Sequence, residues 1–343
     1  MANRKCERLF HSPFTIYHRS VNSRILIIIN PAAARARRAW PIVRDRLDSQ
    51  GISYDVHETQ RPGDATTAVS AALNSGCGLI SVVGGDGTLS EAANGFFEID
   101  FSNDSMPQPL SPDATLAILP AGTGDDFARN LRGNRVPLEQ WLETFITHCR
   151  QSRAGTTRLV DVIRVRTDQY RRHLLCINAS TLGLGGETAA RVAAQRNALR
   201  RLSGEARFVI AAMGALAAWR ERPVKIRIDG ATVTEGPLNL AAVANARYAG
   251  GGMMLSPQAE IDDGKLDVVT VSGLKRANIL RELTRIHKGG HVANPKVKII
   301  QGRHVSIETF TLKDALPIEV DGNVSGHTPA DYSVMPGALR FVV

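Results

Sequence analysis

The chain has 343 residues, of which 42 are lysine or arginine and 33 are aspartate or glutamate, giving a net charge of +9. This length allows two domains, and the positive charge favours an anionic partner such as a phosphate, a lipid headgroup or a nucleic acid. No stretch is apolar over the about 18 residues that a membrane-spanning helix needs. The four cysteines lie far apart without a C-x-x-C pair, which argues against a zinc site or disulfide framework and indicates a reducing, cytoplasmic compartment.

The positive charge is concentrated in residues 191–225. Eight basic residues in this segment stand against Glu205 and Glu221. Nucleic-acid binding has only this positive charge in its favour, so we expect no nucleic acid as partner. The basic residues of the segment 191–225 are Arg191, Arg196, Arg200, Arg201, Arg207, Arg220, Arg222 and Lys225.

Residues 1–22 lack the continuous apolar core of a signal peptide, and we interpret them as a variable N-terminal extension.

Residues 23–150 alternate between short apolar runs and helical patterns. This alternation predicts an α/β fold with a doubly wound parallel sheet, in which ligands bind at the carboxyl ends of the strands. The segments that end in Asn30, Thr59, residues 84–88 and residues 121–126 all reach that edge. Strands are predicted over 24–31, 52–59, 78–88 and 115–127, and helices over 35–51 and 63–76.

After about residue 150 the chain changes to short alternating strands, which predict a mostly antiparallel, β-sandwich-like domain. Helices at about 186–221 and 275–288 interrupt it. We therefore predict an α/β domain over 23–150, joined by the C-terminal segment 333–343, and a β-rich domain over 151–332. A cleft between the two is a favoured place for a ligand.

The segment Gly-Gly-Asp-Gly-Thr at residues 84–88 lies between a strand pattern and a helix pattern. Glycines at such a turn let backbone N–H groups approach an anion, and the helix dipole helps to hold it. The acidic residue Asp86 in an anion site is explained if the site also binds a cation or transfers a proton. An ordinary tight turn between a strand and a helix explains the same residues about equally well.

Several motifs in a fixed order resemble the diacylglycerol kinase catalytic-domain family, from about residue 23 to the end. The family includes bacterial lipid kinases and, more distantly, sphingosine and ceramide kinases; it shares the GGDGT turn with NAD kinases and phosphofructokinases. No G-x-x-x-x-G-K-[ST] motif is present, so the chain is not a P-loop enzyme. The motifs are INP (29–31), GGDGT (84–88), GTGDDFARN (122–130), NASTLGLGGE (178–187), AGGGMMLSPQAEIDDGKLDVV (249–269) and VDGN (320–323).

The resemblance implies an ATP-dependent lipid kinase that phosphorylates the hydroxyl of diacylglycerol or a related lipid, with ATP and Mg²⁺ as cofactors. The α/β domain would be the NAD-kinase/phosphofructokinase-like nucleotide domain, and the β-rich domain would hold the lipid and a metal. Judged by its sequence alone, Thr59 is equally well an exposed threonine at a strand end. The nucleotide contacts implied are Asn30, Thr59, Gly84, Gly85, Asp86, Gly87, Thr88 and Thr123.

Acidic residues in both glycine-rich turns are candidates for catalysis. Asp86 is suited to hold Mg²⁺, because hard cations take oxygen ligands. Asp126 matches the acid of the family, whereas Asp125 stands where the family usually has asparagine. Two further positions depart from the family: Ser90 replaces an asparagine, and the glycine usual after Asn-Pro at 30–31 is missing.

The largest departure is Asn323. The family ends this strand with Asp-Gly-Glu, and the glutamate is thought to accept the hydroxyl proton. An amide cannot accept a proton at neutral pH, although it can orient a hydroxyl. Asp321 and Asp86 are the acids that could take its place. Asn323 therefore supports an alternative, a family member that binds nucleotide or lipid with weak or no transfer; NAD kinase is a second alternative.

The segment 259–267, Ala-Glu-Ile-Asp-Asp-Gly-Lys-Leu-Asp, is a candidate metal loop. By the resemblance, Asp263 and the backbone carbonyls of Glu260 and Lys265 would bind a structural Mg²⁺. The spacing alone favours a simple Asp-Asp-Gly hairpin turn.

The apolar segment 207–219 could line a lipid slot as a helix, while the arginines that flank it meet anionic headgroups. A buried helix between domains explains it as well. The expected partners are a lipid substrate, an anionic membrane surface that the protein meets peripherally from the cytoplasm and, as an open option, a second copy in a homodimer.

Overall fold

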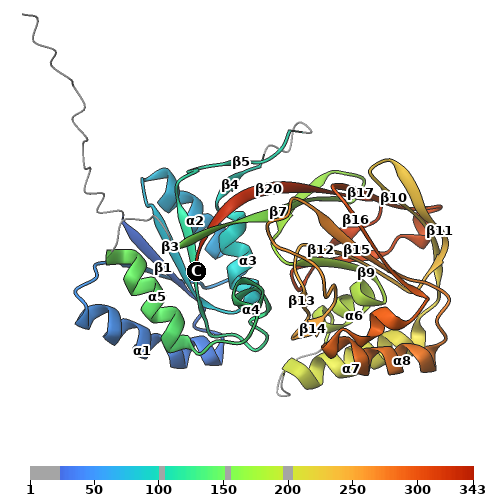
Figure 1. The fold of residues 1–343 in the computed structure, drawn as a ribbon, viewed down its shortest axis with the longest axis horizontal. Coiled ribbons are helices and arrows are strands. Elements are labelled where there is room, and N and C mark those ends of the chain that lie inside the picture. Colours follow the sequence, from blue (N-terminus) through green and yellow to red (C-terminus); the bar gives the residue numbers. More distant parts are fainter. Residues whose placement is uncertain (1–23, 100–104, 151–155, 196–203) are drawn as a thin grey trace, which may run out of the picture.

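The computed structural model describes residues 24–99, 105–150, 156–195 and 204–343. The predicted extension 1–22 lies outside these residues, as do the basic residues Arg196, Arg200 and Arg201. Among the helices in the described ranges, none is both long and apolar enough to cross a bilayer. Figure 1 shows an N-terminal half with helices on both faces of a sheet and a C-terminal half made mainly of strands.

The N-terminal half is built on four parallel strands in the order β2-β1-β3-β6. Every residue of β1 and β3 is buried, as expected for parallel strands covered by helices on both faces. The strands are β1 (Ile25–Ile29), β2 (Asp55–Glu58), β3 (Leu79–Gly84) and β6 (Thr115–Pro120), with a small hairpin of β4 (Phe97–Glu98) and β5 (Gln108–Pro109).

Five helices cover this sheet. In α1 the buried residues are Ala36, Ala39, Val43 and Leu47, and this spacing of three and four places them on one face of the helix. The helices are α1 (Ala34–Ser49), α2 (Asp64–Asn74), α3 (Asp86–Asn94), α4 (Asp126–Arg132) and α5 (Leu138–Arg150).

The C-terminal half contains an antiparallel sheet in the order β16-β15-β12-β9-β18-β19. The predicted fold class, a parallel α/β half followed by an antiparallel sandwich-like half, is confirmed. The strands of this sheet are β9 (Ala179–Gly183), β12 (Leu240–Ala244), β15 (Leu266–Val271), β16 (Val297–Gly302), β18 (Pro317–Val320) and β19 (Asn323–His327).

The parallel strands of the N-terminal half belong to a ten-stranded sheet that runs through both halves. The last strand, β20 (Ala330–Val342), pairs in parallel with β6 through Arg340 and Phe341, and it pairs antiparallel with β7 (Thr157–Thr167) and β17 (His304–Thr309). Figure 1 shows β7 and β20 crossing the top of the molecule from one half to the other. The other strands of this sheet are β8 (Arg172–Cys176), β10 (Arg222–Ile228) and β11 (Ala231–Leu238).

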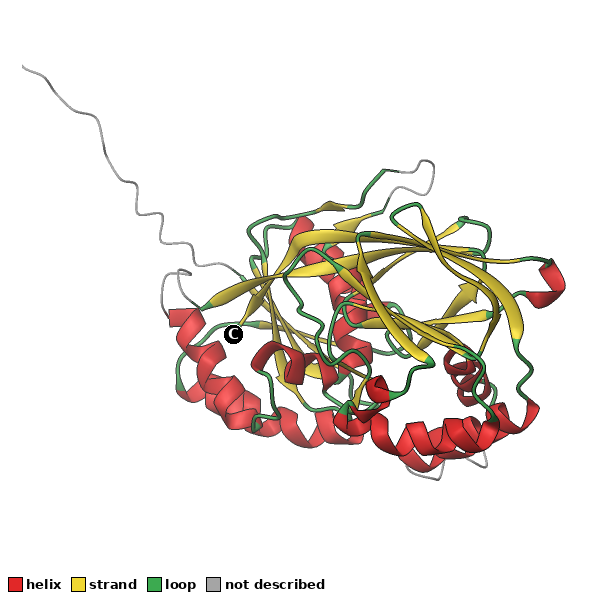
Figure 2. Cartoon of the chain, turned by 45° about the vertical axis from the view of Figure 1, so that its right-hand side comes forward, coloured by secondary structure: helices red, strands yellow, loops and turns green. Residues whose placement is uncertain are grey.

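The remaining helices gather along one side of the C-terminal half, at the lower edge in Figures 1 and 2. They are α6 (Leu184–Ala193), α7 (Gly204–Ala218) and α8 (Arg276–Arg285). Shorter elements are the hairpin β13 (Tyr248–Ala249) and β14 (Met253–Met254) and the 3₁₀ turns η2 (Ile286–Lys288), η3 (Gly290–Ala293) and η4 (Leu312–Asp314).

Candidate functional site

The carboxyl ends of the parallel strands bring the predicted nucleotide residues to one edge of the sheet. The backbone N–H of Thr59 donates to Ile29 O at 2.8 Å, which places Thr59 beside Asn30 at the ends of β2 and β1. Asn30 Oδ1 accepts a hydrogen bond from the N–H of Ala32 at 3.1 Å. The segment 84–88 ends β3 and begins α3, and Thr123 follows β6 in the neighbouring turn.

The two glycine-rich turns touch through their backbones. A Cβ on Gly85 would lie 2.9 Å from Gly122 Cα, and a Cβ on Gly122 would lie 2.5 Å from Gly85 Cα. Real Cβ atoms do not approach other atoms so closely, so any side chain at either position would push the turns apart. The motifs at 84–88 and 122–126 therefore form one structural unit.

Two arginines from other elements are bonded to the second turn. Arg35 Nη1 donates to Gly122 O at 2.8 Å, and Arg135 Nη2 donates to Thr123 O at 3.2 Å and Gly124 O at 3.0 Å. Both guanidinium groups thus lie at the edge of the sheet where the predicted phosphates would be. Neither arginine was predicted as a site residue, because the spacing along the chain carries no sign of this contact.

Asp86 accepts hydrogen bonds from the N-terminus of α4. Its Oδ1 accepts from the N–H of Phe127 at 2.9 Å and its Oδ2 from the N–H of Asp126 at 3.1 Å. A carboxylate at the start of a helix is stabilised by the free N–H groups and by the helix dipole. This bond pair fixes the side chain of the first motif onto the backbone of the second.

Asp125 and Asp126 complete a compact group of acids around Asp86. Burial, together with the nearby charge of Asp86, raises the pKa of Asp125 from 3.8 to about 6, although Asp125 Oδ1 accepts from the N–H of Gly122. The pKa of Asp126, which is only 2 % exposed, is raised by burial and by Asp86 as well. Asp126 Oδ2 accepts from the N–H of Gly251 at 2.7 Å, but its buried Oδ1 has no hydrogen-bond partner.

The β13–β14 hairpin approaches this group from the C-terminal half. Asn130 Nδ2 donates to Asn178 Oδ1 at 2.9 Å and to Tyr248 O at 3.1 Å, which ties α4 to the hairpin. The guanidinium of Arg129 lies 4.7 Å from the centroid of the Tyr248 ring. These residues were not predicted as site residues, because their roles depend on contacts between distant segments.

Asp321 has a different environment, in the turn between β18 and β19. Its backbone is left-handed, with φ at 45°. Its Oδ2 accepts from the N–H of Ile177 at 2.9 Å and from Ser90 Oγ at 2.8 Å, and its Oδ1 accepts from the N–H groups of Asn178 and Ala179 and from Cys176 Sγ. Burial raises the pKa of Asp321, and the hydrogen bonds oppose that shift. Both oxygens are thus engaged in holding backbone and side chains of both halves together.

Asn323 is exposed and lines a cleft of about 440 Å³ between the two halves. Helix α3 forms another wall of the cleft. Among the described residues that line the cleft, Glu91 of this helix is the only acidic one. Glu91 Oε2 accepts from the N–H of Gly63 at 3.0 Å, and burial raises the pKa of Glu91. The cleft is lined by Gly63, Thr66, Ser90, Glu91, Asn94, Phe97, Ile99, Arg172, Leu174, Leu175, Val320, Asn323 and Ser325.

The candidate metal loop is held by side chains on neighbouring strands. Asp161 of β7 accepts from the N–H of Gly264 and from the N–H of Gly337 of β20, each at 2.7 Å. Asp263 Oδ1 accepts from the N–H of Lys265 at 2.9 Å, as in a simple turn. In the part of the chain that the structure describes, no group of three or more His, Cys, Asp or Glu side chains is arranged to hold a metal ion. A structural Mg²⁺ on Asp263 and the carbonyls of Glu260 and Lys265 stays a prediction.

Comparison with protein families gives two matches that together span most of the chain. Residues 24–165 match the model of the diacylglycerol kinase catalytic domain. Residues 184–343 match the model of the YegS C-terminal NAD kinase beta sandwich-like domain.

Curated relatives cover nearly the full length. The chain is 27 % identical over 316 residues to "Diacylglycerol kinase" of Staphylococcus carnosus, which covers 91 % of this chain and 92 % of the relative. It is 29 % identical over 292 residues to "Probable lipid kinase YegS-like" of Stenotrophomonas maltophilia, covering 85 % and 87 % of the two chains.

Solved structures share the fold. A diacylglycerol kinase from Bacillus anthracis superposes with a TM-score of 0.64 at 21 % identity, over 93 % of this chain and 96 % of the other. The yeast NADH kinase complexed with NADH superposes with a TM-score of 0.53 at 12 % identity, over 94 % and 83 %. At these identities the likeness concerns the fold alone.

Proposed function

We propose that this chain, whose residues 24–165 match the diacylglycerol kinase catalytic domain, is an ATP-dependent lipid kinase that phosphorylates the hydroxyl of diacylglycerol or a related lipid. The observation that carries the proposal is that the two glycine-rich turns and their three acids are joined, and that α3, which begins in the first turn, also lines a cleft between the halves through Ser90 and Glu91. The names of the relatives, diacylglycerol kinase and lipid kinase, support the same reaction class.

We assign the nucleotide to the carboxyl edge of the parallel sheet. Asn30, Thr59, Thr123 and the turn 84–88 would contact it there, with backbone N–H groups facing the phosphates. The guanidinium groups of Arg35 and Arg135 support this placement, because they add positive charge where a triphosphate would need it.

The group formed by Asp86, Asp125 and Asp126 is suited to bind Mg²⁺, because without a cation its negative charges lie close together. Asp126 Oδ1 is buried without a partner, and the pKa values of Asp125 and Asp126 are raised partly by the charge of Asp86. A divalent cation held by Asp86 and Asp126, directly or through water, would relieve both conditions. When bound, Mg²⁺ neutralises negative charge on the phosphates during transfer.

The proton of the lipid hydroxyl needs an acceptor other than Asn323. Asp321 is a poor choice because both of its oxygens already accept hydrogen bonds, and the oxygens of Asp86 accept from α4. We propose Glu91, whose carboxylate lines the same cleft as Asn323 and whose pKa is raised by burial. Asn323 would then orient the hydroxyl, and Asp321 would position the hairpin that carries Asn323.

We further propose that α7 is the surface that meets the membrane. Its outward side chains Val209, Ile210 and Met213 are 58 %, 46 % and 48 % exposed. A helix on the surface of a globular protein normally presents polar residues to water, so an apolar face is an exception. The exposed basic residues Arg220 and Arg276 at the end of α7 and the start of α8 are complementary to anionic headgroups.

The test is transfer of radiolabelled γ-phosphate by the purified full-length protein to a panel of acceptors. The panel comprises vesicles that contain diacylglycerol, ceramide, a sphingoid base or phosphatidylglycerol, with NAD as the competing soluble acceptor. Label in a lipid supports the proposal, and label in NAD would favour the NAD kinase alternative. Tight ATP binding without label in any acceptor would favour a binding protein in which Asn323 has ended transfer.

A further inference from the structure

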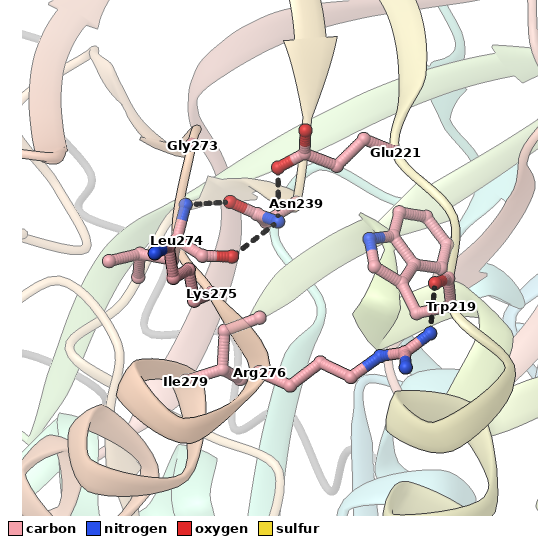
Figure 3. A pocket seen from close by; sticks show the side chains of 8 residues that line it. All are labelled: Trp219, Glu221, Asn239, Gly273, Leu274, Lys275, Arg276 and Ile279. Atoms are coloured by element: carbon pink, nitrogen blue, oxygen red, sulfur yellow. Dashed lines mark hydrogen bonds between the residues drawn. The ribbon is translucent and has the colours of Figure 1, made fainter.

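A second cavity, of about 280 Å³, lies in the C-terminal half where the end of α7 meets the start of α8 (Figure 3). This volume lies just below the usual range for ligand pockets, which is about 300–1,000 Å³, and suits a headgroup-sized molecule. The cavity shares no lining residue with the cleft. It is lined by Trp219, Glu221, Asn239, Gly273, Leu274, Lys275, Arg276 and Ile279.

The start of α8 carries positive charge that nothing on its own helix balances. Lys275 is the N-cap and Arg276 the first residue; no side chain caps the helix, and its first turn has no acidic residue. The N-terminus of a helix is already positive, so cations there are unfavourable and an anion is favoured. Among the described residues, neither Lys275 nor Arg276 forms an ion pair within 4.0 Å.

The indole of Trp219 gives an independent sign of a missing acceptor. Trp219 is 7 % exposed, and its Nε1 has no hydrogen-bond partner. In Figure 3 the ring nitrogen lies on the side of the indole that faces Asn239 and Leu274 across the cavity. A buried N–H without an acceptor costs free energy, which an anionic oxygen in the cavity would recover.

The other polar groups fix the walls of the cavity. Asn239 Nδ2 donates to Glu221 Oε1 at 2.7 Å and Asn239 Oδ1 accepts from the N–H of Leu274 at 2.8 Å, so the amide is fully oriented. Arg276 Nη2 donates to Trp219 O at 3.1 Å, which holds the guanidinium at the cavity.

The charges at the cavity do not cancel. Glu221 is the one acid among the lining residues that the structure describes, and it stands against Lys275 and Arg276. A third cation is close, because Lys296 Nζ donates to the carbonyl oxygen of Gly273. The cavity itself thus has a guanidinium, an ammonium group and a helix N-terminus, which are donors that recognise phosphate, and the ammonium group of Lys296 adds positive charge next to Gly273.

We infer that this cavity binds a phosphate-class anion, which is either the headgroup of an anionic phospholipid or a soluble phosphate ester. Both sources present the same oxygens to the same donors. The cavity lies at the end of the apolar face of α7, which favours a lipid headgroup. Binding here requires no phosphoryl transfer, so the inference stands or falls separately from the proposed reaction.

The sharpest test replaces the N-cap cation by a built-in anion, Lys275→Asp. Aspartate is a preferred N-cap, so the variant should melt at a higher temperature than the parent in phosphate-free buffer. Because its carboxylate would occupy the anion position, its apparent affinity for glycerol 3-phosphate, measured by thermal shift at constant ionic strength, should fall about tenfold or more.

Two further variants separate this site from general charge effects. Lys313→Asp makes the same charge change at an exposed residue of η4 and should respond to glycerol 3-phosphate as the parent does. Trp219→Phe keeps the ring but removes the N–H, and it should weaken binding about three- to tenfold. Any binding of glycerol 3-phosphate at the proposed nucleotide site, the carboxyl edge of the parallel sheet, is the same in the parent and in all variants. It therefore does not affect the difference between their affinities.

The two sources of phosphate are distinguished with vesicles. Flotation is measured with neutral phosphatidylcholine vesicles and with vesicles that also contain phosphatidylglycerol. A headgroup site predicts that Lys275→Asp loses the preference for phosphatidylglycerol while Lys313→Asp keeps it; a site for a soluble ester predicts the thermal shift without that loss. If Lys275→Asp matches the parent in both the thermal shift and flotation, the inference is wrong.

Discussion

Two Asp-Gly pairs, Asp86-Gly87 and Asp321-Gly322, lie on opposite sides of the boundary between the halves, and both aspartates accept backbone N–H groups of another segment. Asp86 accepts from the start of α4, and Asp321 accepts from residues 177–179. Their neighbours differ. Asp86 has Asp125 and Asp126 beside it, whereas Asp321 is surrounded by donors, including Ser90 and Cys176.

The role of each aspartate therefore depends on which charges and hydrogen-bonding groups around it are left unsatisfied. Around Asp86 there is excess negative charge and an unpaired oxygen of Asp126, so a cation is still needed. Around Asp321 every oxygen is used, so the residue is suited to hold structure. We therefore expect substitutions at Asp86 to act on transfer and substitutions at Asp321 to act on stability.

The largest effect is expected for Asp86→Asn. Loss of the charge that would hold Mg²⁺ should lower transfer to lipid by about 10³-fold or more. The amide can still accept one N–H of α4, so the free energy of unfolding should fall by only about 1–2 kcal/mol. Steady-state transfer and denaturant unfolding check the two parts, and transfer within a few-fold of the parent would remove Asp86 from the catalytic group.

The next effect concerns the cleft. Asn323→Glu restores an acid where the family has one, and a positioned base contributes about 10²–10⁴-fold, so transfer should rise by about tenfold or more. Asn323→Gln, which has the same length without the charge, is the control and should show no rise. In the parent the proposed base is Glu91, so Glu91→Gln should abolish most of the transfer, and adding Asn323→Glu to that variant should restore part of it. If Asn323→Glu slows transfer in the parent, the added acid does not act as a base and this expectation is wrong.

Asp321→Asn tests the structural side of the comparison. Its new NH₂ group would face the N–H of Ile177 or Asn178, and a hydrogen-bond acceptor would be lost in a buried network. The free energy of unfolding should fall by about 2–4 kcal/mol. Chemical denaturation measures it, and a loss below that of Asp86→Asn would contradict the contrast between the two residues.

The smallest effect is expected for Asp125→Asn and depends on pH. Because burial raises the folded-state pKa of Asp125 to about 6 from 3.8, its ionised form is disfavoured in the folded protein. The cost is absent well below pH 3.8, grows between the two pKa values and is complete above about pH 6, where the substitution should stabilise by about 1–2 kcal/mol.

Urea unfolding of the parent and Asp125→Asn at pH 8 and pH 4 checks this sign. Asparagine also suits the left-handed backbone at this residue, where φ is 49°. That backbone contribution is the same at both pH values, so only a gain that is larger at pH 8 is due to the charge. An equal gain at both would show that the carboxylate is not strained by burial.

Much of the N-terminal half could be predicted from the sequence, because its signals are local. The buried run of β1 and the glycines at 84–88 predict a strand and a turn without reference to other segments. The resemblance to the diacylglycerol kinase catalytic-domain family and the α/β-plus-sandwich fold are confirmed for the same reason, since the motifs lie in continuous stretches.

The rest depends on contacts between segments far apart in the chain. No local pattern says that Asp321 would accept from residues 177–179 and Ser90, or that Arg35 would reach Gly122. We predicted from the sequence that residues 333–343 join the first half. That prediction did not include the pairing of β7 with β20 in one sheet that runs through both halves. The domain boundaries and the roles of the site residues stay predictions.

The most direct measurement is single-turnover transfer of radiolabelled γ-phosphate from ATP to diacylglycerol vesicles by the parent, Asp86→Asn and Asp321→Asn, at a temperature where all three are folded. We expect label in the lipid from the parent, label within about tenfold of the parent from Asp321→Asn, and background from Asp86→Asn. Transfer by Asp86→Asn equal to that of the parent, or background from the parent itself, would contradict a kinase whose cation site is built on Asp86.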